Sequence, residues 1–170
     1  MTAPFGATLP VLRCRDLEVS STAELVTRYG LTLQWVADEA AIPGSYWGDA
    51  EAGIIGLALF VRADTPVHSM LHELCHVICM DSGRRHALDT DSGGDYAEED
   101  AVCYLQILLS EYIPDMGRDR MLADMDCWGY TFRLGSAREW FLHDAADARD
   151  WLLREGLIDT SDRPLWRLRP

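Results

Sequence analysis

The pattern His72-Glu73-Leu74-Cys75-His76 constrains this chain more than any other feature, because its two histidines can share one metal ion if the segment is a helix. At i,i+4 spacing both imidazoles lie on one helix face, about 5–6 Å apart at Cβ, and can converge on a zinc ion about 2.0–2.1 Å away. Glu73 lies between them and stays free to act as a general base. The HExxH pattern therefore predicts a zinc hydrolase site with His72 and His76 as ligands.

The surrounding residues predict that this pattern lies on a helix over residues 66–80. Asp64 supplies a capping residue, Pro66 suits the first helical position, and no glycine or proline follows until Gly83. Apolar residues at three- and four-residue spacing would form one buried stripe, made up of Val67, Leu71, Leu74 and Ile78. The motif histidines and His68 fall on the other side. The alternative interpretation is a hydrogen-bonded histidine pair on a half-exposed helix, without metal.

A third ligand is needed, because a catalytic zinc ion usually has three protein ligands and one open position for water. The pattern HExxHxxGxxH would require Gly at position 79 and His at position 82, where this chain has Cys79 and Ser82. Cys79 is expected to serve as a small buried side chain. The next acidic cluster, residues 95–100, opens a second apolar-periodic segment that runs to Pro114. We therefore expect the third ligand among these carboxylates.

Helical spacing distinguishes Glu98 from its neighbour Glu99. Counted from Glu98, the positions that share its face are all apolar: Ala101, Val102, Leu105, Leu108 and Leu109. The face of Glu99 instead carries Cys103, Gln106 and Ser110. A carboxylate that points into a core needs a cation, because its desolvation is otherwise costly. We therefore predict Glu98 as the third zinc ligand, with Glu99 as the alternative.

The rest of the chain predicts an α+β fold. We expect a short helix from the capping box at residues 21–24 to Gly30, strands at 31–37 and 53–62, a polar loop at 81–95, and helices near 117–128 and between Ser136 and Gly156. A chain of 170 residues with 48% hydrophobic content suits one domain. Its core would span about residues 20–114, followed by a C-terminal helical extension over about 115–170.

These motifs resemble the ImmA/IrrE type of minimal gluzincin metallopeptidase, whose pattern is HELGH followed by ExxANxFAxxLL. The matching segments are residues 72–76 and 98–109, and the resemblance covers about residues 20–114. It implies a zincin-like fold with a small sheet, an active-site helix and a glutamate-bearing helix. It also implies His72 and His76 as zinc ligands, Glu98 as the third ligand and Glu73 as the base.

The chain departs from the family pattern in several respects: Cys75 replaces Gly, Val102 replaces Asn, Tyr104 replaces Phe, and the Met-Pro that often follows the Leu pair is absent. The change at Val102 matters most, because a polar group that could orient a metal ligand is lost. Members of the family often cleave a repressor or act in stress responses, and no feature of this chain identifies such a target.

Composition limits the partners and the compartment. The formal net charge is −13, all 15 basic residues are Arg, and such an acidic chain is not expected to bind nucleic acid directly. The cysteines are odd in number and follow no disulfide or zinc-ribbon spacing, which predicts reduced thiols in a cytoplasmic protein: Cys14, Cys75, Cys79, Cys103 and Cys127. No apolar run approaches the roughly 20 residues that a membrane span requires.

Taken together, the residues predict a zinc-dependent metallopeptidase that hydrolyses a peptide bond with a metal-activated water and Glu73 as the base. The expected partner is a protein or peptide substrate, a regulatory protein among them, held along the edge of the second strand. The sequence predicts no particular oligomeric state. Candidates for stabilising the oxyanion are Tyr96, Tyr104, Tyr130 and His68. The alternatives are a non-catalytic zinc-containing regulatory or binding module of zincin fold, and a hydrolase of a non-peptide amide.

Overall fold

The computed structural model describes residues 10–170 and has the expected α+β composition, with seven α-helices, three strands and two 3-10 turns in that range. In chain order the elements are η1 (Cys14–Asp16), α1 (Val19–Arg28), β1 (Thr32–Trp35), β2 (Gly53–Ile55), β3 (Ala58–Val61), α2 (Val67–Cys79), α3 (Ser82–His86), α4 (Tyr96–Leu109), η2 (Ser110–Tyr112), α5 (Gly117–Trp128), α6 (Ala137–His143) and α7 (Ala146–Arg154).

The three strands form one small sheet in the order β1-β3-β2. β1 runs parallel to β3, with Leu33 opposite Leu59, and β2 runs antiparallel to β3, with Ile54 opposite Leu59. The outer edge of β2 is covered by the chain itself, because the N–H of Thr90 donates to the carbonyl of Ile54 and the N–H of Gly56 donates to the carbonyl of Leu88. The expected substrate position along this edge is therefore already filled by residues 88–90.

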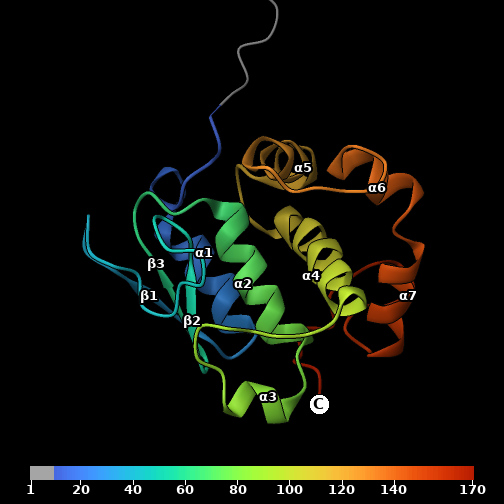
Figure 1. Cartoon of the computed structure of the whole chain (residues 1–170), viewed down its shortest axis with the longest axis horizontal. Helices are drawn as coiled ribbons and strands as arrows, with labels where there is room; N and C mark the ends of the chain where they lie inside the picture. Colours follow the sequence, from blue (N-terminus) through green and yellow to red (C-terminus); the bar gives the residue numbers. More distant parts are fainter. Residues whose placement is uncertain (1–9) are drawn as a thin grey trace, which may run out of the picture.

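Helix α2 lies between the sheet and α4 and forms the centre of the core (Figure 1). Its predicted apolar stripe is confirmed, since all four of these side chains are fully buried: Val67, Leu71, Leu74 and Ile78. The helix is buried on its other faces as well, and only His72 and Glu73 are partly exposed. Because removal of apolar surface from water is the main force that orders the chain, this helix is fixed firmly in place.

The local signal at the start of α2 differs from the prediction. Pro66 is the N-cap residue and precedes the first helical position, and no side chain caps the helix. Asp64 instead pairs with Arg62, whose Nε lies 2.6 Å from Oδ1 and whose Nη2 lies 2.9 Å from Oδ2. The aspartate therefore fixes the turn between β3 and the helix.

Three segments of the structure differ from their predicted form. The strand expected over 53–62 is a hairpin, because Gly56 takes a positive φ of +58° in the two-residue turn between β2 and β3. The loop expected over 81–95 contains α3, whose N-cap Asp81 accepts a hydrogen bond from the N–H of Arg84 at 2.9 Å. The helix expected from Ser136 breaks at Asp144, which leaves the helical region with φ −139° and accepts from Arg133 Nε at 2.8 Å.

The last residues of the chain pack against the core. Trp166 packs against Tyr29 at a tilt of 46° with 5.4 Å between ring centroids, and the N–H of Arg169 donates to the carbonyl of Ile78 at 2.9 Å. The C-terminal residues therefore reach the end of the HExxH helix, as Figure 1 shows for the chain end beside α3. Among residues 10–170, no helix combines the length and the apolar character that crossing a bilayer would require.

Candidate metal centre

The structure brings His72, His76 and Glu99 together, with one potential ligand atom of each within 4.8 Å of the others. The two imidazoles lie on one face of α2, where their Nε2 atoms are 3.1 Å apart. Glu99, in the first turn of α4, places Oε1 3.1 Å from His72 Nε2 and Oε2 3.3 Å from His76 Nε2. Two ring nitrogens and one carboxylate therefore face a common point.

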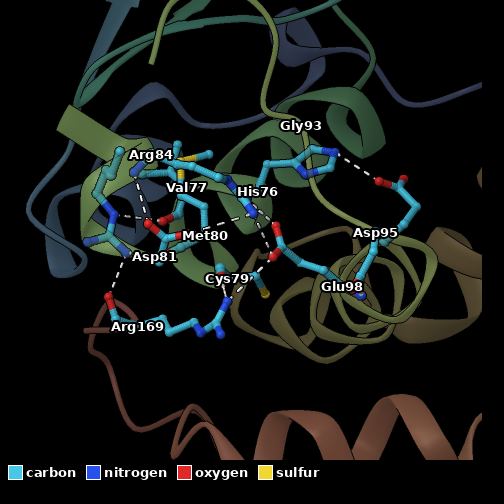
Figure 2. A network of polar contacts seen from close by, with 12 residues as sticks. His76, Val77, Cys79, Met80, Asp81, Arg84, Gly93, Asp95, Glu98 and Arg169 are labelled. Atoms are coloured by element: carbon cyan, nitrogen blue, oxygen red, sulfur yellow. Dashed lines mark hydrogen bonds and ion pairs between the residues drawn. The ribbon is translucent and has the colours of Figure 1, made fainter. Parts of the chain in front are cut away.

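Glu98 does not belong to this cluster, so its predicted position beside the histidines is wrong. Its carboxylate points the other way and meets two arginines, accepting hydrogen bonds from both Arg84 Nη atoms, with Nη1 at 3.1 Å, and from Arg169 Nη1 at 3.5 Å. Figure 2 shows the Glu98 side chain between the guanidinium groups of Arg84 and Arg169. The argument that a buried carboxylate needs a cation holds, but arginines from α3 and the C-terminus supply it.

The geometry of the cluster fits a tetrahedral metal. Ligand atoms about 2.0–2.1 Å from a tetrahedral zinc ion lie about 3.3 Å from one another. The distances between the two Nε2 atoms and from them to the Glu99 oxygens are 3.1 to 3.3 Å. Two imidazole nitrogens and one carboxylate are also a ligand set that zinc prefers. The cluster therefore has the composition and the spacing of a three-ligand zinc site.

Gln106 fixes the orientation of His72. The fully buried amide donates from Nε2 to the carbonyl of His68 at 3.2 Å, so its oxygen is free to accept from His72 Nδ1 at 2.8 Å. A proton on Nδ1 leaves the lone pair on Nε2, the atom that faces His76 and Glu99. Val102, where the resembled family has Asn, is fully buried. A polar partner for one ligand is thus present four residues further along α4.

His76 is also suited to bind a metal ion, but for a different reason. Burial, together with the neighbouring His72, lowers the pKa of His76 to about 3. The imidazole is therefore neutral at pH 7, the state that a metal ligand requires. Its buried Nδ1 has no hydrogen-bond partner within residues 10–170. The ring nitrogen that faces His72 and Glu99, and that is available to a metal ion, is Nε2.

Glu73 lies beside the cluster without joining it. Burial raises the pKa of Glu73 to about 7, with Glu51 and Glu99 acting in the same direction and His72 opposing them. A carboxyl group with a pKa near 7 can accept a proton and return it at neutral pH, which suits a general base. Glu73 also borders both of the cavities that adjoin the cluster.

Two cavities meet at the His72–Glu73–Glu99 side of the cluster. The larger, of about 800 Å³, extends toward the end of α5 and is bounded by Trp47, Glu51 and Tyr130. The smaller, of about 270 Å³, extends past His76 and is bounded by residues 90–93. The cluster thus lies at the junction of two spaces that could hold the two sides of a substrate bond.

The other side chains considered from sequence take different places. Tyr96 is 92% exposed at the rim of the larger cavity, whereas Tyr104 stacks on Phe141 at 4.8 Å between ring centroids. Tyr130 and His68 lie beside the metal cluster and bond to each other, with Tyr130 Oη 3.2 Å from His68 Nδ1. Cys79 is fully buried and belongs to the apolar core, as expected.

Several residues that shape the site carry no signal in a motif. Arg84 and Arg169 approach from segments that sequence spacing does not relate to α4, and Glu51 reaches the first turn of α2 from the loop before β2. Of these residues, only Gln106 could have been found from the sequence, because helical spacing puts it on the same face of the helix as Glu99.

Comparisons of the chain with models of protein families, with curated proteins and with solved structures find no match. The chemistry of the site therefore has to be inferred from its own residues.

Proposed function

We propose that this chain is a zinc-dependent metallopeptidase of zincin-like fold, with His72, His76 and Glu99 as metal ligands. The observation that carries the proposal is the convergence of these three groups, with Glu73 beside them, at the junction of two cavities. The order of sheet, HExxH helix and glutamate-bearing helix agrees with the expected fold class. The third ligand moves by one residue from the sequence prediction, to Glu99.

The residues of the chain divide the chemistry among them. When bound, a zinc ion supplies a Lewis acid that polarises a carbonyl and lowers the pKa of water. Glu73 accepts a proton from the attacking water, and later donates it to the leaving amine. Gln106 keeps the Nε2 lone pair of His72 directed at the metal position, because its amide oxygen holds the proton on Nδ1.

Three features favour an enzyme over a binding module that holds zinc only for stability. A structural zinc site usually closes with four protein ligands, whereas the cluster found among residues 10–170 has three. A carboxylate that contacts no ligand position but has its pKa raised to about 7 serves no evident purpose in a structural site. The cluster also borders open cavities of about 270 and 800 Å³, so a substrate can reach it.

Zinc content and proteolysis test the proposal together. Elemental analysis of the purified chain should give about one zinc per chain, and the variants His72→Ala and His76→Ala should lose it. Glu73→Gln should keep the zinc and the fold while proteolysis of casein or of proteins in a cell extract falls on the order of 10²–10⁴-fold. Glu24→Gln, the same change on the exposed face of α1, is the matched control and should leave both unchanged.

Each arm has an outcome that would overturn the proposal. Wild type that holds no zinc, or histidine variants that hold as much as wild type, would contradict the metal site. Cleavage by Glu73→Gln at the wild-type rate would contradict the role of the base. Zinc-loaded wild type that binds proteins in the extract and cleaves none of them would favour the module.

A further inference from the structure

The larger cavity beside the cluster has an unusual charge. The carboxylates on its wall are Asp49, Glu51, Glu73, Glu99 and Asp100. No arginine side chain is among the lining residues, and the chain has no lysine. A bound zinc ion would balance only the part of this charge that lies at its ligands. The remaining wall of the cavity therefore keeps a strongly negative potential.

Two of these carboxylates are free to meet a ligand. Asp49 and Asp100 are exposed at the rim, and in the described part of the chain neither takes part in an ion pair. Glu51, in contrast, is held in place, because Oε1 accepts from Trp128 Nε1 at 2.6 Å and Oε2 accepts from Ser69 Oγ. The wall of the cavity thus combines one carboxylate held by hydrogen bonds with two exposed carboxylates that form no ion pair in the described part of the chain.

Aromatic rings accompany the carboxylates. Trp47 is 76% exposed and Tyr96 is 92% exposed, and both border the larger cavity. Exposed rings beside carboxylates form a favourable environment for a guanidinium or ammonium group, because the cation is attracted to the ring face as well as to the anions. The same chain contains such contacts, for example Arg13 over Trp128 at 5.1 Å.

The direction from which a peptide enters is limited by the sheet. The outer edge of β2 would be the usual place for an added strand, but residues 88–90 already bond to it through Leu88 and Thr90. The neighbouring residues 90–93 border the smaller cavity, of about 270 Å³. The larger cavity, of about 800 Å³, is therefore the side of the cluster with room for several substrate residues.

We propose that this site takes a cationic peptide segment, and that an arginine or lysine side chain of the substrate lies in the larger cavity between Asp49, Glu51 and Asp100. The inference rests on the proposed peptidase function for the position of the scissile bond. Recognition of the cationic side chain is a separate property of the cavity wall. It can therefore be measured by binding, without cleavage.

The binding test uses the zinc-loaded Glu73→Gln protein and three fluorescein-labelled dodecapeptides. The peptides share one sequence except at three positions, which hold Arg, Gln or Glu. By fluorescence anisotropy the Arg peptide should bind at least about tenfold more tightly than the Gln peptide, and the Glu peptide more weakly still. Raising the salt concentration should reduce the difference, because screening weakens exposed charge pairs.

Variants locate the effect in the cavity. Asp49→Asn with Asp100→Asn should weaken binding of the Arg peptide about three- to tenfold, the combined effect of two exposed ion pairs. The matched control, Asp38→Asn with Asp150→Asn, changes the net charge equally at exposed positions outside the cavity and should change binding less than twofold. Trp47→Ala should also weaken the Arg peptide more than the Gln peptide.

The outcomes separate this inference from the proposed function. Equal binding of the Arg and Gln peptides, or equal losses in the two double variants, would overturn the cationic preference. Zinc-loaded wild type is then incubated with the same peptides, and cleavage is followed by mass spectrometry. Cleavage of all three peptides at similar rates would overturn the inference and support the peptidase, whereas selective binding of the Arg peptide without cleavage would support the inference and contradict the peptidase.

Discussion

Glu98 and Glu99 are neighbours in the first turn of α4, yet they lie in two opposite environments. One residue turns the helix by about 100°, which directs Glu98 into the buried space near α3 and Glu99 toward the cavities. Glu98 is 4% exposed and meets Arg84 and Arg169, whereas the Glu99 side chain is 44% exposed and meets two histidines. Each carboxylate faces cationic or potentially metal-binding groups, but of different kinds.

Arginines and histidines give the two carboxylates different roles. An arginine keeps its charge at any physiological pH, so the Glu98 contacts tie α4 permanently to α3 and to the C-terminal residues. Two histidines and a carboxylate form a group that can gain or lose a metal ion, because ring nitrogens bind the ion only after they release their protons. Arginines on one side hold the helix still, and this rigidity keeps Glu99 at the distance from α2 that a metal needs.

Exchanging each carboxylate for an amide gives the largest expected contrast. Glu99→Gln removes an anionic ligand and should weaken zinc binding more than about 100-fold, beyond the 10–100-fold typical of losing a group behind the ligands. Glu98→Gln should change zinc affinity less than about tenfold, because its carboxylate does not contact the histidines. Competition with a chromogenic chelator measures both constants. The opposite result would return the third ligand to Glu98 and contradict the side-chain directions in the structure.

The second contrast concerns the support behind His72. Gln106→Leu should lower zinc affinity about 10–100-fold, since His72 loses the acceptor for its Nδ1 proton. Gln106→Glu preserves an acceptor oxygen and should retain more of the affinity, which separates orientation from simple loss of packing. The matched control is Ser110→Ala, which lies directly after α4 in η2 and whose hydroxyl donates to the Ile107 carbonyl. Equal zinc affinity of wild type and Gln106→Leu would show that the hydrogen bond does not orient the ligand.

Much of the site could be predicted from sequence because it depends on local spacing. The HExxH helix needs only four residues of separation between His72 and His76, and the buried stripe of α2 follows the same period. Helical spacing also placed Glu98 correctly on the buried face of α4. The sheet and the positions of α1, α4 and α5 were expected to within a few residues.

The sequence could not predict which carboxylate faces the two histidines, because this depends on residues far away in the chain. Spacing shows that Glu98 needs a cation but not that Arg169, 71 residues later, provides it. The hairpin over 53–62 differs from the predicted single strand for a local reason, because Gly56 turns the chain back with φ +58° and is the one turn signal inside an apolar run. The first error thus concerns a tertiary contact, and the second a weak local signal.

The contacts of Glu98 with arginines should contribute more to the free energy of unfolding than the contacts of Glu99 with histidines. In metal-free protein, Glu98→Gln should lower the free energy of unfolding by about 2–3 kcal/mol, somewhat less than for a fully buried pair because the arginines are partly exposed. Glu99→Gln should lower it by less than about 1 kcal/mol, since its carboxylate is half exposed. Urea denaturation of both variants checks this difference. A larger loss for Glu99→Gln would show that the metal side holds α4.

The two sides should also differ in their response to acid, with the smallest of these effects. Burial, together with His72 and Arg13, lowers the pKa of His68 to about 3. The unfolded chain binds a proton near pH 6.5, so the contribution of neutral His68 is complete above that pH and is lost as the pH falls toward about 3. At pH 5 the loss from this residue should be about 2 kcal/mol, from 1.36 kcal/mol per pH unit. The arginines near Glu98 keep their charge over this range.

His68→Asn replaces the imidazole with an amide that does not titrate and can still bond to Tyr130. Metal-free wild type and His68→Asn are unfolded in urea at pH 7 and pH 5, and the wild type should lose about 2 kcal/mol more. Equal losses would mean that His68 is protonated, or exposed to water, in the folded protein.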